Sequence, residues 1–268
     1  MKQDEQWKVG SVVKALQILN CFSARRTEIS LAQISQELDI PKSTAYNLVK
    51  TLVSEQFLRR AENSSNYLPG IRLFTQGYCA RNSIPVISYA IPILEDVTRT
   101  TGEITYLSTV LGDNLLVLEG TYPEKRTPTY TTGGKTLPLN TCSAGKMILS
   151  TLPDSVIERF SRRGLAASTP NTIITHDALM REMESIRAMG YAIDNEEETM
   201  GIRCASVAIY GGSGRAVGTI SISGTVRSIT DDVVKMALPV MEKAAHFLAR
   251  MEYAFPALYP DDFECQGS

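Results

Sequence analysis

One short stretch of the chain carries polar side chains whose types and spacing suit contact with nucleic acid. The set has no acidic member and comprises Lys42, Ser43, Thr44, Tyr46, Asn47 and Lys50. Ammonium groups can neutralise phosphates, hydroxyls near a helix N-terminus can bond phosphate oxygens, and an amide or phenol can reach base edges. Arg59 and Arg60 follow shortly after. The pattern predicts a DNA-binding surface, although a helix that is merely solvated carries a similar face.

A second group of polar side chains alternates with apolar ones near the C-terminal end. Thr219, Ser221 and Ser223 share one face of a predicted strand, and Cys204 and Ser206 share a face of the strand before it. An antiparallel sheet can present such a face to water. If the long C-terminal helix and the segment from Leu137 to Lys146 cover part of it instead, the hydroxyls and the thiol line a small-ligand pocket.

The cysteines allow a different hypothesis. Cys204 or Cys142 is the candidate nucleophile of a cysteine-dependent enzyme in the sheet domain, with the helical N-terminal part serving as a dimerisation module. No histidine lies near Cys204 in the sequence, which favours a shape-setting contact, but His176 can be brought close by the fold.

Other motifs fail on spacing. Gly133-Gly134-Lys135-Thr136 resembles the end of a phosphate-binding loop, yet Thr129 stands where the pattern needs glycine. The glycines from 211 to 214 are better interpreted as a hairpin turn, because Val217 replaces the third glycine of a dinucleotide fingerprint. The two histidines lie outside metal-ligand spacings, so we expect neither a metal nor another cofactor.

Composition favours a globular protein of two domains. The 268 residues are 43% apolar and 21% charged, and the formal charge is -2. Ten Lys and Arg against seven Asp and Glu give residues 1 to 80 a charge of +3, whereas 17 against 22 give the remainder -5. Five scattered cysteines and no long apolar run lead us to expect a reducing cytoplasm and no membrane contact.

The elements that must position the first polar group form a helix-turn-helix with a wing. Val12, Leu16 and Leu19 predict a helix behind Ser11 as N-cap, and Ser30 with Gln33 forms a capping box for a second helix. A third helix starts at Pro41. Residues 57 to 68 then predict a basic hairpin, and a further helical stripe follows at Ile71, Phe74 and Tyr78.

The rest of the chain predicts an α+β domain with helices gathered to one side of an antiparallel sheet. Helices are expected at 91–99, 143–151, 154–163, 176–189 and about 230–253. Strands are expected at 104–110, 115–122, 127–132, 191–194, 202–210 and 217–224. The acidic run Glu196-Glu197-Glu198 is interpreted as a solvated loop.

The N-terminal residues resemble the IclR family of bacterial transcription regulators. The matching segments are Ser30-Leu31-Ala32-Gln33-Ile34, Pro41-Lys42-Ser43-Thr44-Ala45-Tyr46, Leu52-Val53 and Phe57-Leu58-Arg59-Arg60. Two positions depart from the family pattern, where Asn47 and Leu68 replace common arginines. Their loss removes possible phosphate contacts and lowers the expected salt dependence of DNA binding.

We expect a winged head at 9–70, a linker helix at 71–83, a sheet domain at 84–255 and a tail at 256–268 that matches no known pattern, with the boundary where Asn82-Ser83-Ile84-Pro85 interrupts the helical stripe. The resemblance implies that the sheet domain is a GAF-like effector-binding and oligomerisation domain. It further implies a homodimer or homotetramer, a near-palindromic double-stranded DNA operator controlling a catabolic operon, and no enzymatic activity. A keto, hydroxy or sugar acid is the implied effector. The implied contacts are Leu137, Ser143, Ala144, Asp194, Cys204, Ser221 and Ser223.

Overall fold

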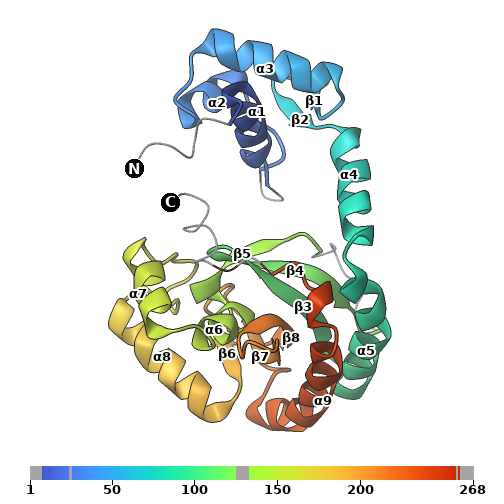
Figure 1. Cartoon of the computed structure of the whole chain (residues 1–268), viewed down its shortest axis with the longest axis vertical. Helices are drawn as coiled ribbons and strands as arrows, with labels where there is room; N and C mark the ends of the chain where they lie inside the picture. The colour runs from blue at the N-terminus through green and yellow to red at the C-terminus, as the bar shows by residue number, and fades with distance from the viewer. Residues whose placement is uncertain (1–7, 24–25, 125–132, 258, 260–268) are drawn as a thin grey trace. The chain divides into compact units, whose positions relative to one another are not determined.

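The computed structural model describes residues 8–23, 26–124, 133–257 and 259, and these residues form two compact units (Figure 1). The division falls between Ser83 and Ile84. The first unit is a small helical head with a two-stranded hairpin, and the second is built on a six-stranded sheet. The predicted α+β class, a winged helix-turn-helix followed by an antiparallel sheet domain, is confirmed.

The head contains the predicted series of helices and the wing. Its elements are α1 (Gly10–Asn20), α2 (Leu31–Glu37), α3 (Lys42–Ser54), β1 (Leu58–Arg60), β2 (Tyr67–Pro69) and α4 (Ile71–Asn82). The capping box of α2 forms as predicted, with Gln33 N–H donating to Ser30 Oγ at 3.2 Å and Ser30 N–H donating to Gln33 Oε1 at 2.9 Å. The predicted cap of α1 is wrong, because the residue before the helix is Val9 and Ser11 lies inside it.

The core of the head leaves two apolar helix faces uncovered. Ile18, Ile34 and Val49 are fully buried, so one side of each helix from α1 to α3 points inward. The predicted stripe of α1 lies mostly outside this core, since Val12 and Leu16 are 54% and 56% exposed. The stripe of α4 is also exposed, with Phe74 at 74%. Burial of these faces therefore needs something other than this core.

Within its described residues, the second unit has runs of three strands and three helices between a first and a last helix. Its helices are α5 (Pro85–Thr101), α6 (Ser143–Ser150), α7 (Asp154–Arg162), α8 (His176–Met189) and α9 (Asp231–Ala249), with short 3₁₀ turns at Leu139–Thr141 and Glu252–Ala254. Its strands are β3 (Ile104–Leu111), β4 (Asn114–Thr121), β5 (Thr136–Pro138), β6 (Ala192–Asn195), β7 (Ile202–Tyr210) and β8 (Ala216–Thr225).

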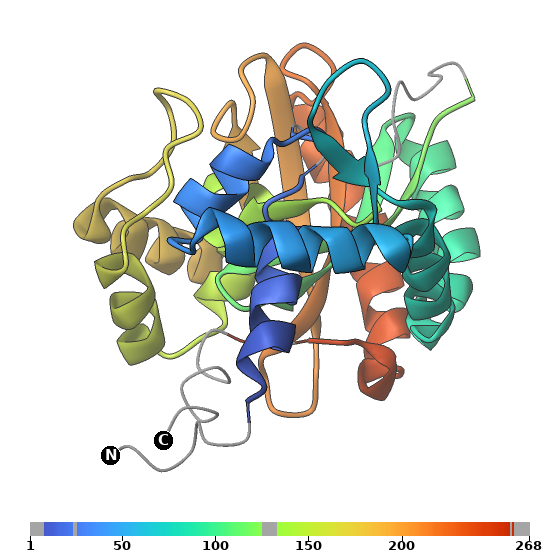
Figure 2. The same ribbon diagram turned by 90° about the horizontal axis from the view of Figure 1, so that it is seen from above.

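Helices cover both faces of the sheet, which corrects the expectation that they gather on one side. The strand order is β5-β4-β3-β8-β7-β6, with antiparallel pairing throughout. α5 and α9 pack together over one face, whereas α6 lies over the other and is backed by α8 (Figures 1 and 2). The apolar members of the alternating strands, such as Ile220 and Ile222, point toward α5 and α9. Their polar neighbours therefore point toward α6.

Other differences from prediction have local causes. α5 begins six residues earlier than expected, because Pro85 occupies the first helical turn and Pro92 is accommodated inside the helix. β5 is only three residues long and gives no periodic signal. α9 ends at Ala249, earlier than predicted. The strand predicted at 127–132 lies outside the described residues.

One glycine fixes how closely α6 approaches the chain before it. A Cβ at Gly145 would lie 2.3 Å from the carbonyl oxygen of Leu139 and 2.6 Å from its Cα. Both are backbone atoms, so a side chain at this position has no room. The absence of a side chain lets the first turn of α6 pack directly on the 3₁₀ turn at Leu139–Thr141.

Candidate DNA-binding surface and effector site

The outer face of α3 presents the predicted DNA-contacting side chains. Ala45 and Val49 are fully buried and anchor the opposite face of the helix in the core. Thr44 is half-buried, and the others are exposed: Lys42, Ser43, Tyr46, Asn47 and Lys50. The helix thus offers a polar surface without an acidic residue, which suits insertion into a major groove.

The wing is a regular hairpin with its two arginines exposed. Arg59 pairs across the strands with Leu68, and Arg60 pairs with Tyr67, whose ring centre lies 5.9 Å from the guanidinium. The turn is held by Glu28, which accepts hydrogen bonds from Ser64 Oγ (2.6 Å) and Asn66 Nδ2 (3.0 Å). These bonds, Ser64 first, lower the pKa of the Glu28 carboxyl.

In the second unit, strand register brings the predicted effector contacts onto one face of the sheet. Cys204 lies directly opposite Asp194 on one side and Ser223 on the other. Ser206 lies opposite Ser221 in the next row. Directly opposed residues of antiparallel strands share a face, so the two polar patterns coincide as predicted.

This polar face is covered by a helix and not open to water. Every residue of α6 is buried, and Ser143 at its first position is 1% exposed. Ser143 Oγ lies 2.7 Å from Ser206 Oγ, so a hydrogen bond joins the start of α6 to the centre of the sheet. Of the two readings that the sequence left open, the roofed one is correct. The segment from Leu137 to Lys146 supplies the roof, whereas the C-terminal helix covers the opposite face.

The first turn of α6 lies over the polar face, and its Gly145 N–H bonds the Cys142 thiol. The amide groups that open a helix have no intrahelical acceptor, and the helix dipole makes this end partly positive. Ser143 and Ala144 occupy this turn, directly over Ser206. The arrangement can hold an anionic oxygen.

Asp194 is 1% exposed at the edge of this face. Its Oδ1 accepts a hydrogen bond of 2.7 Å from the backbone N–H of Glu197. Burial raises the pKa of Asp194 to about 7, even though that hydrogen bond opposes the change. Near neutral pH the side chain is therefore partly protonated, and it can donate a hydrogen bond as well as accept one.

The cysteines have the properties of packing residues. Cys204 Sγ–H donates to Ser223 Oγ at 3.1 Å. Burial raises the pKa of the Cys204 thiol, and it raises that of Cys142 to about 12, so neither is a thiolate at neutral pH. His176 begins α8, and its Nδ1 lies 2.8 Å from Ser161 Oγ. The nucleophile and base pair that the enzyme hypothesis needs is not formed by these residues.

The site also contains an ionic cluster that sequence analysis missed. Lys146, one turn after Ser143 on α6, is 1% exposed. Its Nζ donates to Glu197 Oε1 at 2.6 Å and to Glu182 Oε1 at 2.8 Å. Burial alone would lower the pKa of Lys146, but the carboxylates of Glu197 and Glu182 outweigh it and raise the pKa. Lys146 is therefore charged.

The acidic run at 196–198 is not a solvated loop, which corrects the prediction. Glu197 is only 7% exposed and pairs with Lys146. Glu196 has φ of 64° and its carboxylate accepts the N–H of Gly201 at 2.6 Å. Glu198 pairs with Lys135 at 3.3 Å. Each carboxylate thus holds a different neighbour, and together they fix the turn after β6.

Three further observations delimit the site. Leu137 lies on β5, at the opposite edge of the sheet from Asp194 on β6, and pairs with Leu115. The hydroxyls of Ser108 and Thr219 are buried without a hydrogen-bond partner among the described residues. The two residues face each other across β3 and β8, in the row next to Ser221. Unsatisfied buried hydroxyls are uncommon and extend the polar character of this face.

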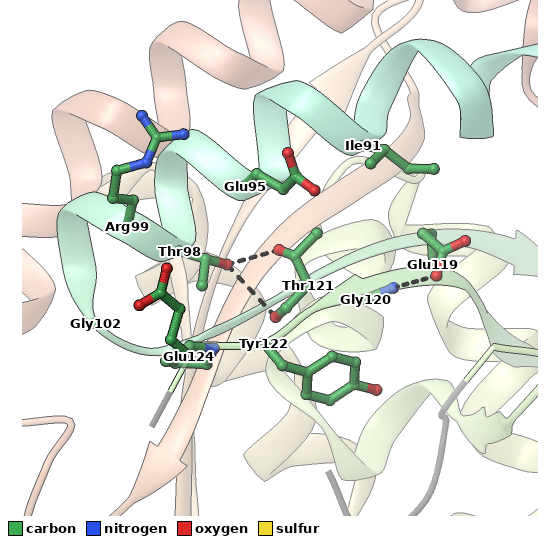
Figure 3. A pocket seen from close by; sticks show the side chains of 11 residues that line it. Ile91, Glu95, Thr98, Arg99, Gly102, Glu119, Gly120, Thr121, Tyr122 and Glu124 are labelled. Carbon is green, nitrogen blue, oxygen red and sulfur yellow. Dashed lines mark hydrogen bonds between the residues drawn. The ribbon is translucent and has the colours of Figure 1, made fainter. Parts of the chain in front are cut away.

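A separate hollow of about 960 Å³ opens beside α5 and β4 (Figure 3). In its wall, Thr98 Oγ1 lies 2.6 Å from Thr121 Oγ1, and Glu95 and Glu119 also line the hollow. None of the predicted effector contacts lines it. Within the described ranges we find no group of three or more metal-ligating side chains and no helix capable of crossing a membrane.

Comparison with protein families identifies both units. Residues 11–62 match the IclR helix-turn-helix domain, and residues 79–250 match the C-terminal domain of the bacterial transcriptional regulator IclR. The chain belongs to the IclR family. The family resemblance seen in the head is thereby confirmed for both parts of this IclR-family regulator.

Named relatives agree with this assignment. The HTH-type transcriptional regulator XynR of Escherichia coli K12 is 29% identical over 84% of this chain and 89% of its own. The HTH-type transcriptional repressor AllR of Klebsiella pneumoniae is 28% identical over 82% of this chain and 81% of its own. These proteins are named as regulators, and the enzyme alternative finds no support among them.

Solved structures of the IclR family share the fold. A regulator from Alicyclobacillus acidocaldarius matches with a TM-score of 0.79 at 23% identity, over 92% of this chain and 100% of that one. An IclR homologue from Microbacterium hydrocarbonoxydans, solved in complex with 4-hydroxybenzoate, matches with a TM-score of 0.71 at 20% identity, over 90% of this chain and 99% of that one.

Proposed function

We propose that this IclR-family regulator senses a small organic acid in its sheet domain and thereby changes the affinity of its winged heads for a near-palindromic operator of a catabolic operon. The observation that carries the proposal is the polar sheet face under the start of α6, where Ser206, Ser221 and the first turn of the helix converge. The hydroxyls and the amides of the first helical turn are donors of the kind that bind a carboxylate. The Microbacterium homologue with bound 4-hydroxybenzoate adds support for an organic acid.

Each predicted contact residue has a role that follows from its chemistry. The amides of Ser143 and Ala144 bind the carboxylate, and the hydroxyls of Ser221 and Ser223 donate to its oxygens or to a keto group. Asp194, partly protonated near pH 7, bonds a ligand hydroxyl with little repulsion of the anion. Cys204 shapes the wall and orients Ser223. Leu137 supplies apolar contact from the far edge.

In the head, Lys42, Lys50, Arg59 and Arg60 contact phosphates, while Tyr46 and Asn47 face the bases. Ser43 and Thr44 bind backbone oxygens at the start of α3. A single head offers few cations, so strong binding needs two heads on symmetric half-sites. The exposed apolar faces of α1 and α4 are the surfaces that a second copy would cover in a homodimer or homotetramer.

A gel-shift titration against the DNA upstream of its own gene tests the regulator function. We expect specific binding that weakens as salt rises, and the Lys42→Ala and Arg59→Ala variants should each lower the salt slope by about 1. Lys235→Ala, an exposed lysine on α9, is the matched control and should bind as the native chain does. Equal affinity for the upstream DNA and for random DNA would refute the proposal.

A thermal-shift screen tests the effector site. Keto, hydroxy, sugar and hydroxybenzoic acids are added to the full chain, and an acid that binds the native state raises the midpoint of unfolding by mass action. The Ser221→Ala and Asp194→Ala variants should lose this response. If both variants respond as strongly as the native chain to every active acid, the site lies elsewhere.

A further inference from the structure

Burying the ionic cluster around Lys146 costs desolvation free energy, which an apolar core avoids. Two charged groups removed from water lose hydration that their attraction does not reliably restore, and apolar replacements of buried ion pairs are often neutral or stabilising. Here the desolvated groups are Lys146 and Glu197, at 1% and 9% side-chain exposure, with Glu182 at 27%. Stability alone is therefore a weak reason for this cluster.

Its position relates the cluster to the effector site. Lys146 follows Ser143 by one helical turn, so both side chains lie on the same side of α6. Ser143 bonds Ser206 on β7, while Lys146 bonds Glu197 in the turn after β6. The backbone N–H of that same Glu197 donates to Asp194 Oδ1. Glu197 therefore links α6, whose first turn is the proposed carboxylate-binding site, to Asp194, the side chain proposed to bind a ligand hydroxyl.

The turn is supported from behind as well. Thr172 Oγ1–H donates to the carbonyl of Glu197 at 2.7 Å, and Thr169 Oγ1–H donates to that of Glu196 at 2.6 Å. Glu197 Oε2 is buried and has no partner among the described residues. Glu197 Oε2 is thus a buried acceptor beside Asp194 that a hydrogen-bond donor of a bound molecule can satisfy.

Resting on the function proposed above, we propose that Lys146 is a positioning residue of the effector site, because its buried ammonium fastens the turn 194–198 to α6 and so sets the orientation and the charge of Asp194. Lys146 does not touch the effector in this scheme. It acts through Glu197, and loss of the ammonium frees the turn from the helix that forms the other side of the site.

The charges that face Asp194 allow a test that separates the proposed positioning role of Lys146 from a purely structural role. Glu197 raises the pKa of Asp194 and Lys146 lowers it, while the N–H groups of Glu197 and Glu198 lower it further. The thiols of Cys204 and Cys142 also face this carboxyl. Removal of Lys146 must therefore raise the pH at which Asp194 titrates, and Glu197→Gln must lower it.

The first experiment needs no effector. The ¹³C carboxyl signal of Asp194, assigned by its absence in Asp194→Asn, is titrated in the full-length native chain and in the Lys146→Met and Glu197→Gln variants. We expect midpoints displaced in opposite directions. Lys135→Met, which removes the outer pair with Glu198, is the matched control and should leave the midpoint near that of the native chain. Unchanged midpoints in both test variants would overturn the inference.

The second experiment measures binding of 4-hydroxybenzoate, pyruvate and gluconate. The double variant Lys146→Met/Glu197→Met keeps the volume of the two most buried members of the cluster without their charges and leaves Glu182, which is 27% exposed, so it should fold and bind operator DNA normally. Any of these acids that stabilises the native chain should bind the double variant at least tenfold more weakly. Equal affinity in the folded double variant would overturn the inference.

The two experiments separate failure of the inference from failure of the proposed function. If none of the three acids stabilises the native chain, or if Asp194→Ala and Ser221→Ala respond normally, the proposed effector site fails. The titration of Asp194 then still decides whether Lys146 sets the state of that carboxyl.

Discussion

At the scale of single residues, burial decides chemistry in this chain more than residue type does. Asp194 and the thiols of Cys142 and Cys204 are reactive groups by type. Inside the sheet domain burial raises the pKa of all three, which disfavours the charged form of each. In the proposed effector site, these groups would recognise a ligand by hydrogen bonds and shape.

The pH dependence of stability should show the raised pKa of Asp194. The folded-state pKa of about 7 lies above the ordinary 3.8, so between these values the native state holds a proton that the unfolded state has released. The free energy of unfolding should therefore fall as the pH rises from about 4 to about 7. Asp194→Asn should flatten this part of the profile in denaturant titrations, and an unchanged slope would contradict the assignment.

Thiol accessibility gives a second residue-scale prediction. Cys79 on α4 is exposed, whereas Cys142 is buried and has a pKa near 12. A thiol reagent added at pH 7.5 (about one unit below the ordinary thiol pKa) should label Cys79 rapidly, the half-buried Cys204 more slowly because burial raises the pKa of its thiol, and Cys142 only after unfolding. Mass spectrometry of tryptic peptides identifies the labelled sites. Rapid native labelling of Cys204 would revive a nucleophilic role.

At the scale of elements, local sequence patterns predicted most of the helices and strands and their polar faces, but not which elements pack against each other. The alternation in β7 and β8 was sufficient to assign the polar face, and Ser30 with Gln33 was sufficient to start α2. The roof of the site depends on packing between distant segments. Lys146 and Glu197 are 51 residues apart, and no local spacing signals their pairing.

The close approach of α6 to the preceding turn can be tested with one methyl group. Gly145→Ala places a Cβ against backbone atoms of Leu139, so α6 must shift, and we expect a loss of about 1–3 kcal/mol in unfolding free energy. Gly77→Ala is the matched control: it lies in α4 with nothing within 4 Å of the added atom, and should stabilise by about 0.5–1 kcal/mol. Similar effects in both would contradict the packing.

At the scale of the whole molecule, apolar surface left open on the head bears on assembly. Val12 and Leu16 on α1 and Ile71 and Phe74 on α4 are each more than half exposed. A second copy is the occupant that the proposed symmetric operator requires.

Loss of this surface should separate the copies. Phe74→Asp puts a charge where Phe74 is 74% exposed, so the isolated fold should tolerate it while an interface would not. Sedimentation should show smaller assemblies, and operator affinity should fall at least tenfold. Ile174→Asp, at a position 57% exposed before α8, is the control and should change neither. If the Phe74→Asp variant sediments as the native chain does, α4 is not part of the interface.

The tight cover formed by α6 has a kinetic consequence. Ser143, Ser206, Ser221 and Asp194 are each at most 5% exposed, so under the proposed function an effector would reach them only when the cover opens. Binding then follows opening, and its observed rate constant should level off at the opening rate as effector concentration rises. The apparent affinity is also lower than the affinity of the open state, by a factor equal to the fraction of molecules that is open. A stopped-flow trace would therefore time the motion of α6, and the speed of the genetic response would be limited by that motion more than by diffusion of the acid.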